Sequence, residues 1–132
     1  MIFQESTLAS GVAAEDQRDK EGYFLVRNAS GELAVSAAAA DKPVGVVHIG
    51  ADKGIRTTYV RPGYGGTVGV KLGTTPGTVN EGTELVLMTD GRVKALPSAA
   101  GTYVVVATAA EPGESDQLLE AVLCRPTSVT IS

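Results

Sequence analysis

Short runs of β-forming residues, each bounded by turn residues, are the feature that most constrains the fold of this chain. Runs of about four to eight residues rich in Val, Thr, Leu and Tyr recur along the sequence, as is typical of strands. Ala37–Ala40 is the only run with strong helix propensity, but it is short and Pro43 follows it closely. The sequence therefore predicts an all-β fold, a small barrel or sandwich. The expected strands lie in residues 22–28, 44–49, 55–61, 67–72, 85–89, 103–107 and 118–125.

The clearest hairpin is expected around Asp90-Gly91. This dipeptide favours a two-residue type I′ turn, which needs positive φ at both positions. Such a turn would pair Met88 with Val93 and Val86 with Ala95 on one face of the hairpin. We therefore expect that face to be buried and the opposite face to be largely exposed to solvent.

An internal repeat relates the two halves of the chain. When residues 22–50 are shifted forward by 60 positions, eight residues meet identical ones, and Ser30-Gly31 falls on Asp90-Gly91. With four extra residues in the second copy, each copy ends in Arg-Pro, at Arg61-Pro62 and Arg125-Pro126. This pattern predicts two related hairpin units, 22–62 and 82–126, joined by a linker over 63–81. One such unit could hardly bury its apolar face alone, so we expect the two to pack together.

Residues 1–21 have no counterpart in the second copy under this alignment, and 22–132 are expected to form the β domain. The first segment contains Ile2, Phe3 and Leu8, and residues 15–21 carry six charges. One interpretation is a frayed terminus followed by a solvated loop. The other is an extended N-terminal arm that becomes ordered on a neighbouring molecule, because Phe3 is one of two phenylalanines in the chain.

Charge and composition exclude several classes of partner. The net charge is −4 and only 5% of the 132 residues are aromatic, which argues against nucleic acid as a partner. No apolar run approaches 18 residues and no basic start precedes an apolar stretch. We therefore expect no membrane span and no secretory leader, and a protein made in the cytoplasm.

Candidate catalytic and metal-binding residues are few. His48 is the only histidine and Cys124 the only cysteine, so neither a histidine cluster nor a cysteine-rich zinc site exists within one chain. A Cys–His pair of Cys124 with His48 has no local support, and each is better interpreted as a strand residue. The expectation is a protein that is not an enzyme and that holds no metal or cofactor.

The second half of the chain resembles a family of viral structural proteins. The stretch from Val79 to Leu87, then Thr89 to Ala95 around the Asp-Gly turn, resembles the small decoration (cement) proteins of tailed-bacteriophage capsids. A Val-rich strand, an Ala-rich loop and a terminal strand follow the hairpin in that family, as they do here. The first unit, with Leu33–Val35 and Pro43–Val47, resembles the same pattern.

This resemblance implies a compact β-tulip or β-barrel domain with a structural function. Such proteins form homotrimers, bind several copies of the major capsid protein on the surface of the expanded head, and cement it against the pressure of the packaged DNA. An N-terminal arm in the family commonly reaches onto the capsid, and residues 1–21 would correspond to it. No catalytic residue is carried over.

Two sets of residues are candidates for the contacts that this function needs. Ile2, Phe3 and Leu8 are expected on the capsid-binding arm. Tyr59 and Tyr64, near the Gly-rich turn, are expected at the subunit interface, because Tyr is apolar with one polar end; the alternative is that both pack in the core. A different class of function is also open, a cytosolic β-barrel that binds a small ligand or carbohydrate in a deep apolar pocket.

Overall fold

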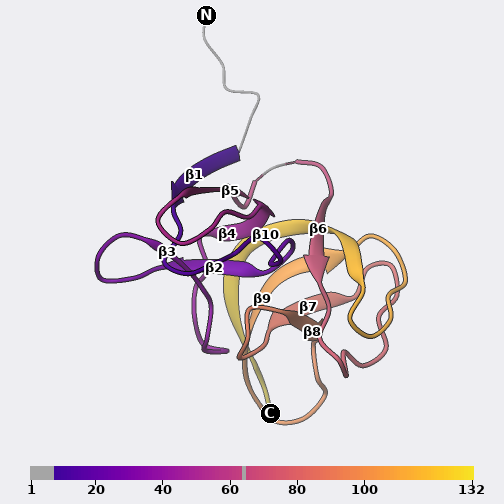
Figure 1. Cartoon of the computed structure of the whole chain (residues 1–132). Helices are drawn as coiled ribbons and strands as arrows, with labels where there is room; N and C mark the ends of the chain where they lie inside the picture. Colours follow the sequence, from indigo (N-terminus) through magenta and orange to yellow (C-terminus); the bar gives the residue numbers. More distant parts are fainter. Residues whose placement is uncertain (1–7, 64) are drawn as a thin grey trace, which may run out of the picture.

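Two antiparallel five-stranded sheets make up the protein in a computed structural model, which describes residues 8–63 and 65–132 (Figure 1). The all-β prediction of a small barrel-like domain is confirmed. The first sheet contains β1 (Leu8–Val12), β2 (Phe24–Arg27), β3 (Leu33–Val35), β4 (Gly45–Ile49) and β5 (Arg56–Val60). The second contains β6 (Val68–Lys71), β7 (Glu84–Leu87), β8 (Val93–Ala95), β9 (Gly101–Ala109) and β10 (Leu118–Ile131).

The two sheets have the same topology. The strand order is β1-β5-β4-β2-β3 in the first and β6-β10-β9-β7-β8 in the second, so each strand corresponds to the one five places later. In each sheet a parallel bridge joins the two edge strands where the sheet curls round, Ala13 to Leu33 in one and Leu72 to Val93 in the other. We call β1–β5 the first unit and β6–β10 the second unit.

The hairpins show the 60-residue repeat residue by residue. β2 pairs with β3 in the register Leu25 to Val35, and β7 pairs with β8 in the register Leu85 to Ala95. The loop of each hairpin ends in a glycine with positive φ, Gly31 or Gly91.

The predicted register of the second hairpin is wrong by one residue. Asp90 does not have positive φ, and the amide of Met88 donates to the carbonyl of Arg92, so the loop has three residues and ends in Gly91 at φ 84°. A three-residue loop of this kind needs only one left-handed residue, which glycine supplies. Because a shift by one residue exchanges the faces of a strand, Leu87 and not Met88 is opposite Val93.

Residues 8–21 were expected to belong to an extended arm with no equivalent in the second unit, but they are part of the folded first unit. Residues 8–12 form β1, which pairs with β5 as β6 pairs with β10. The chain then packs against the first unit at Leu33 of β3, where Ala13 and Gln17 are buried. Gln17 donates from Nε2 to the carbonyl of Leu33 and accepts at Oε1 from the hydroxyl of Thr57, both at 2.8 Å. Residues 13–17 therefore close one end of the first unit. The counterpart of β1, β6, lies in the expected linker 63–81.

The last strand extends past the expected end at Arg125-Pro126. β10 pairs with β9 over Ala121–Leu123, shifts register, and pairs again over Thr127–Ile131. Pro126 lies inside this irregularity, where a missing amide donor interrupts no ladder hydrogen bond. The second unit thus carries a two-stranded extension that the first unit lacks.

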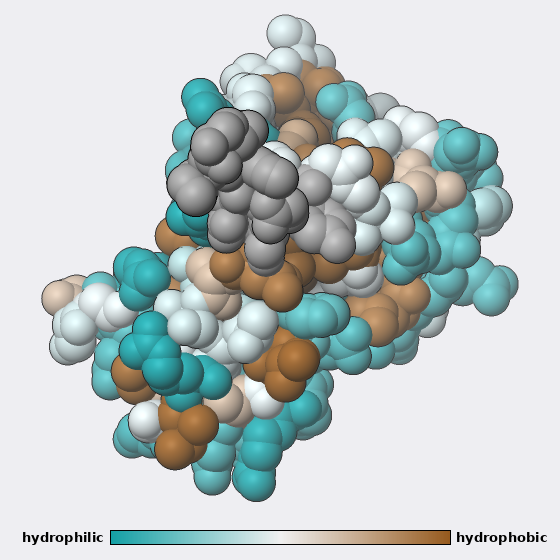
Figure 2. Space-filling model, turned by 90° about the horizontal axis from the view of Figure 1, so that it is seen from above, coloured by the Kyte–Doolittle hydropathy of each residue, from teal (hydrophilic) through white to brown (hydrophobic). Residues whose placement is uncertain are grey.

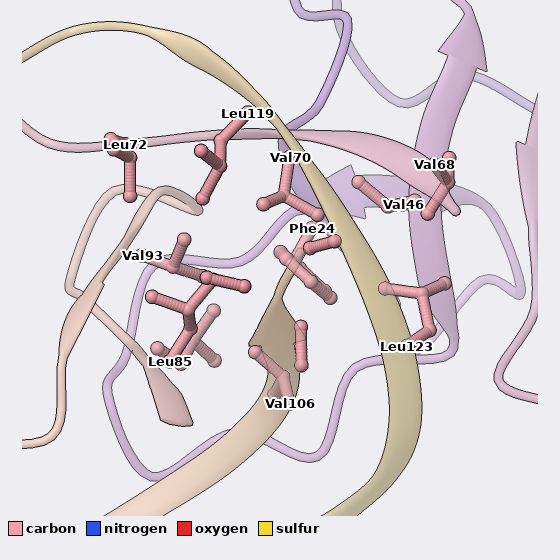
Figure 3. Close-up of a cluster of buried hydrophobic side chains, with 14 of the residues drawn as sticks. Phe24, Val46, Val68, Val70, Leu72, Leu85, Val93, Val106, Leu119 and Leu123 are labelled. Atoms are coloured by element: carbon pink, nitrogen blue, oxygen red, sulfur yellow. The ribbon is translucent and has the colours of Figure 1, made fainter. Parts of the chain in front are cut away.

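The main hydrophobic core lies between the two units and inside the second (Figure 3). Phe24, Val46 and Val60 of the first sheet pack with buried residues from every strand of the second. Phe24 is 2% exposed and lies in the middle of the cluster, between Val70 and Val106. A smaller core, formed by Leu25, Leu33, Val47 and Tyr59, fills the first unit.

An ion-pair cluster ties the β7–β8 loop to the loop before β10. Arg92 contacts Asp90 at 2.7 Å and Asp116 at 2.8 Å. Burial raises the pKa of Asp90, but hydrogen bonds from the side chain and backbone of Arg92 outweigh this effect, so its pKa lies below the ordinary 3.8. The ionised form of Asp90 therefore stabilises the fold above about pH 3.8, and this contribution is lost as the pH falls through the folded-state pKa.

Asp90→Asn should make the free energy of unfolding fall less steeply as the pH is lowered. The amide oxygen can still accept the hydrogen bond from the Arg92 backbone, whereas the ion pair is lost. We expect a loss of less than about 1 kcal/mol at pH 7, because the pair is partly exposed to solvent, and a smaller difference from wild type at pH 2–3. Urea unfolding at a series of pH values measures this, and a difference that grows at low pH would contradict the assignment.

Candidate binding surface

A surface hollow at the junction of the two units is lined in part by Leu8, one of the predicted site residues. It has a volume of about 270 Å³. Its walls come from β1, β4, β5, β6 and β10, together with loop residues before β2 and β6. The residues that line it are Leu8, Glu21, His48, Val60, Thr67, Val68, Gly69, Leu118 and Glu120.

Two leucines make the rim of this hollow apolar. Leu8 is 44% exposed and Leu118 is 41% exposed, although most large apolar side chains of the protein are buried. Gly69 lies beneath Leu118, and a Cβ at that position would come 3.0 Å from the leucine side chain. In the view from above, groups of hydrophobic side chains lie in the lower middle of the face and at its lower left, among hydrophilic ones (Figure 2). Exposed apolar side chains that are grouped in this way are typical of contact surfaces.

The polar groups of the hollow include two carboxylates, those of Glu21 and Glu120. The hydroxyl of Thr67 donates to Oε1 of Glu120 at 2.6 Å, which fixes that carboxylate at the wall. Glu21 and His48, which is exposed near the end of β4, also line the hollow. An apolar group accompanied by a cation would therefore match the surface better than an anion.

Further exposed apolar side chains lie outside the hollow. Ile49 is 62% exposed at the end of β4 and Ile55 is 60% exposed just before β5, while Val122 in β10 is 43% exposed. Sequence reasoning did not select these residues, because apolar residues within a strand pattern are expected to be buried.

The predicted contact residues have different positions. Leu8 is at the rim of the hollow, whereas Ile2, Phe3 and Tyr64 lie outside the described residues. Tyr59 is 4% exposed and packs in the core of the first unit, where its hydroxyl accepts a hydrogen bond from Arg27 at 3.4 Å. In the single chain, Tyr59 is therefore a core residue, which is the alternative given in the sequence analysis. Its strand position faces inward because it lies opposite Val47 and Ala9.

The two residues considered for catalysis or metal binding, His48 and Cys124, lie in different strands, β4 and β10. Cys124 is partly buried, and burial raises the pKa of its thiol, with the charge of Glu84 adding to the effect. A raised pKa keeps the thiol protonated near neutral pH, whereas a nucleophilic cysteine needs a lowered one. Within residues 8–63 and 65–132, no three His, Cys, Asp or Glu side chains are grouped as metal ligands would be. No helix in this part of the chain is long and apolar enough to span a membrane.

The comparisons with known proteins give a likeness of fold. No protein-family model matches the chain, and no curated protein sequence matches it. Among solved structures, the chain is similar to the head fiber gp8.5 N base of bacteriophage phi29, with a TM-score of 0.61 and 18% sequence identity. The match covers 91% of this chain and 95% of that one. The two proteins therefore share a fold over nearly their full lengths.

Proposed function

We propose that this chain is a structural protein of a bacteriophage virion, which binds the outer surface of the expanded head and stabilises it. The observation that carries the proposal is the fold shared with the base of a phage head fiber, over 91% of this chain. Fold alone does not fix function. The sequence resemblance to capsid decoration proteins, which rests on the hairpin motifs, supports the same role.

The distribution of side chains fits a binding protein better than a protein with a deep ligand pocket. Core side chains fill the interior of both units, so the hollows of the described part of the chain are surface depressions. Exposed apolar residues such as Ile49, Ile55 and Leu118 lie on the surface of both units. Contacts with large partners are made by such exposed side chains around a polar rim.

The proposed partner is the major capsid protein, and the proposed state is a homotrimer. Ile2 and Phe3, together with Leu8 at the rim of the hollow, would supply apolar contacts to the capsid. A protein that binds the assembled shell more tightly than loose subunits stabilises the shell by mass action. Three linked copies would strengthen the attachment, because the second and third contacts form at high effective concentration. We propose that the protein stabilises the head by binding alone and catalyses no reaction.

The experiment is a binding assay with undecorated, expanded heads of the phage that encodes the chain. The purified protein is mixed with heads and centrifuged, and the bound protein is quantified. We expect it to co-sediment with the heads and to saturate at a fixed number of copies per head. Failure to co-sediment at micromolar concentration would overturn the proposal.

The contribution of the N-terminal residues is tested by an Ile2→Asp, Phe3→Asp double variant. Two charges in an apolar contact must be desolvated on binding, so we expect affinity for the heads to fall at least about tenfold. Ser30→Lys, in the exposed β2–β3 loop, is the control and should bind as wild type does. Equal binding by the double variant and the control would remove these residues from the proposed contact.

A further inference from the structure

The terminal part of the second unit is a two-stranded ribbon with open edges. β10 pairs with β6 only over Leu118–Ala121, whereas it pairs with β9 as far as Ile131. Within the described residues, no strand covers the other edge of β10 from Val122 onward. β9 likewise pairs with β7 only opposite Val105, Ala107 and Thr108, which leaves its first residues open on that side. In Figure 1 the yellow end of β10 runs downward from the second sheet to the C-terminus.

The internal repeat shows that the first unit closes without such a ribbon. β5 corresponds to β10, but β5 ends at Val60 after five residues, whereas β10 continues past its irregularity to Ile131. The first unit closes and buries its core without such an extension. Two strands alone are marginally stable in water, so an extension of this kind gains stability when further strands are added to it.

The sequence of the ribbon lacks the protection that exposed strand edges have. Soluble proteins usually place charges, proline or bulges along an open edge to prevent pairing with other chains. Here the proline and the irregularity occur only at the start, at Pro126, and residues 127–132 and 101–109 contain no charged residue. The exposed side chains are mostly threonine and serine, and Thr102 and Thr130 bond to each other across the ribbon at 3.2 Å.

We propose that the open edge of β10, over residues 127–131, pairs with the open edge of β9 of a second copy of this chain. An uncharged edge has no complementarity to a charged partner, and two uncharged edges of identical chains meet without repulsion. The pairing joins different edges, so it is head-to-tail and can close into a ring. Three copies then form a ring of six strands with no open edge, which agrees with the trimer of the proposed function, on which this inference rests.

The test combines mass measurement with a charged variant. Light scattering of the wild type should give three times the chain mass of 13.5 kDa. The Ser128→Lys, Thr130→Lys double variant, with both substitutions at exposed positions of β10, should give 13.5 kDa at the same concentration. Ser30→Lys, a charge added on the first unit, should keep the wild-type mass. A wild type that is a monomer or a dimer, or a double variant that keeps the trimer mass, would overturn the proposal.

Amide hydrogen exchange of the wild type gives a result that does not depend on the folding of a variant. In an antiparallel pair, every second residue directs its N–H away from its partner. We expect those amides within residues 127–131 to be protected at trimer concentrations and to exchange rapidly on dilution to monomer. Unprotected amides in the trimer would place its interface elsewhere. Binding to heads is measured separately, so a monomer that binds heads would reject the ribbon pairing and keep the proposed function.

Discussion

Phe24→Ala is expected to lower the free energy of unfolding by about 3–5 kcal/mol, because it empties the middle of the core between the two units. The side chain is 2% exposed and contacts residues of both sheets. The backbone also joins the units here, since the amide of Phe24 donates to the carbonyl of Gly91 at 2.8 Å. Urea unfolding followed by circular dichroism measures the effect.

The repeat provides a matched control for this substitution. Glu84 occupies the equivalent position, 60 residues later, but its side chain is exposed. Glu84→Ala should therefore change the free energy of unfolding by no more than about 0.5 kcal/mol. Equal effects of the two substitutions would contradict the position of the main core between the units, whatever the size of the Phe24 effect.

Gly50→Ala should be the other strongly destabilising change, with a cost of about 2–4 kcal/mol. A Cβ at Gly50 would overlap the backbone carbonyl of Gln17, which cannot move without displacing residues 13–17. That segment closes the first unit through the hydrogen bonds of Gln17 to Leu33 and Thr57. The substitution therefore tests whether these residues belong to the folded domain.

Gly73→Ala is the control for this second prediction. A Cβ there would meet the end of the Met88 side chain, which is flexible and can turn away. We expect a cost below about 1 kcal/mol, measured by the same urea unfolding. If Gly50→Ala is as mild as Gly73→Ala, the segment is not held against the first unit as described.

The sequence allowed most of the strands to be predicted, because their residues carry the pattern locally. The repeat of Leu25 and Leu85, with Gly31 and Gly91 in the turns, depends on propensities and turn chemistry that each segment contains by itself. The register of the Asp90-Gly91 hairpin was missed because the same dipeptide fits two-residue and three-residue loops. Which loop forms is decided by the burial of Leu87 opposite Val93.

Other features depend on partners distant in the chain. Residues 8–12 contain Ser10 and Gly11, which have low strand propensity, and they form β1 because β5 offers a partner. Gly11 is needed at this position because a Cβ would come 2.8 Å from the side chain of Leu33. The burial of Gln17 likewise follows from acceptors and donors 16 and 40 residues away. No local pattern in the sequence indicates these contacts.

The candidate surface was harder to predict than the fold. Leu8 was selected as an apolar residue outside the repeat, and it does lie on the rim of the hollow. Tyr59 was selected for its chemistry, but it lies in the middle strand pairing of the first sheet, opposite Val47 on one side and Ala9 on the other, and is buried there. Exposure of a strand residue depends on which sheet face is covered, and the sequence of one strand does not carry that information.

The rupture temperature of expanded phage heads tests the central claim most directly. Undecorated heads are heated with and without saturating protein, and DNA release or shell unfolding is followed by calorimetry. A protein that binds and cements the shell should raise the rupture temperature, in proportion to the fraction of sites filled. An unchanged rupture temperature at concentrations that saturate binding would contradict a cementing role, and no binding at all would contradict the proposed function.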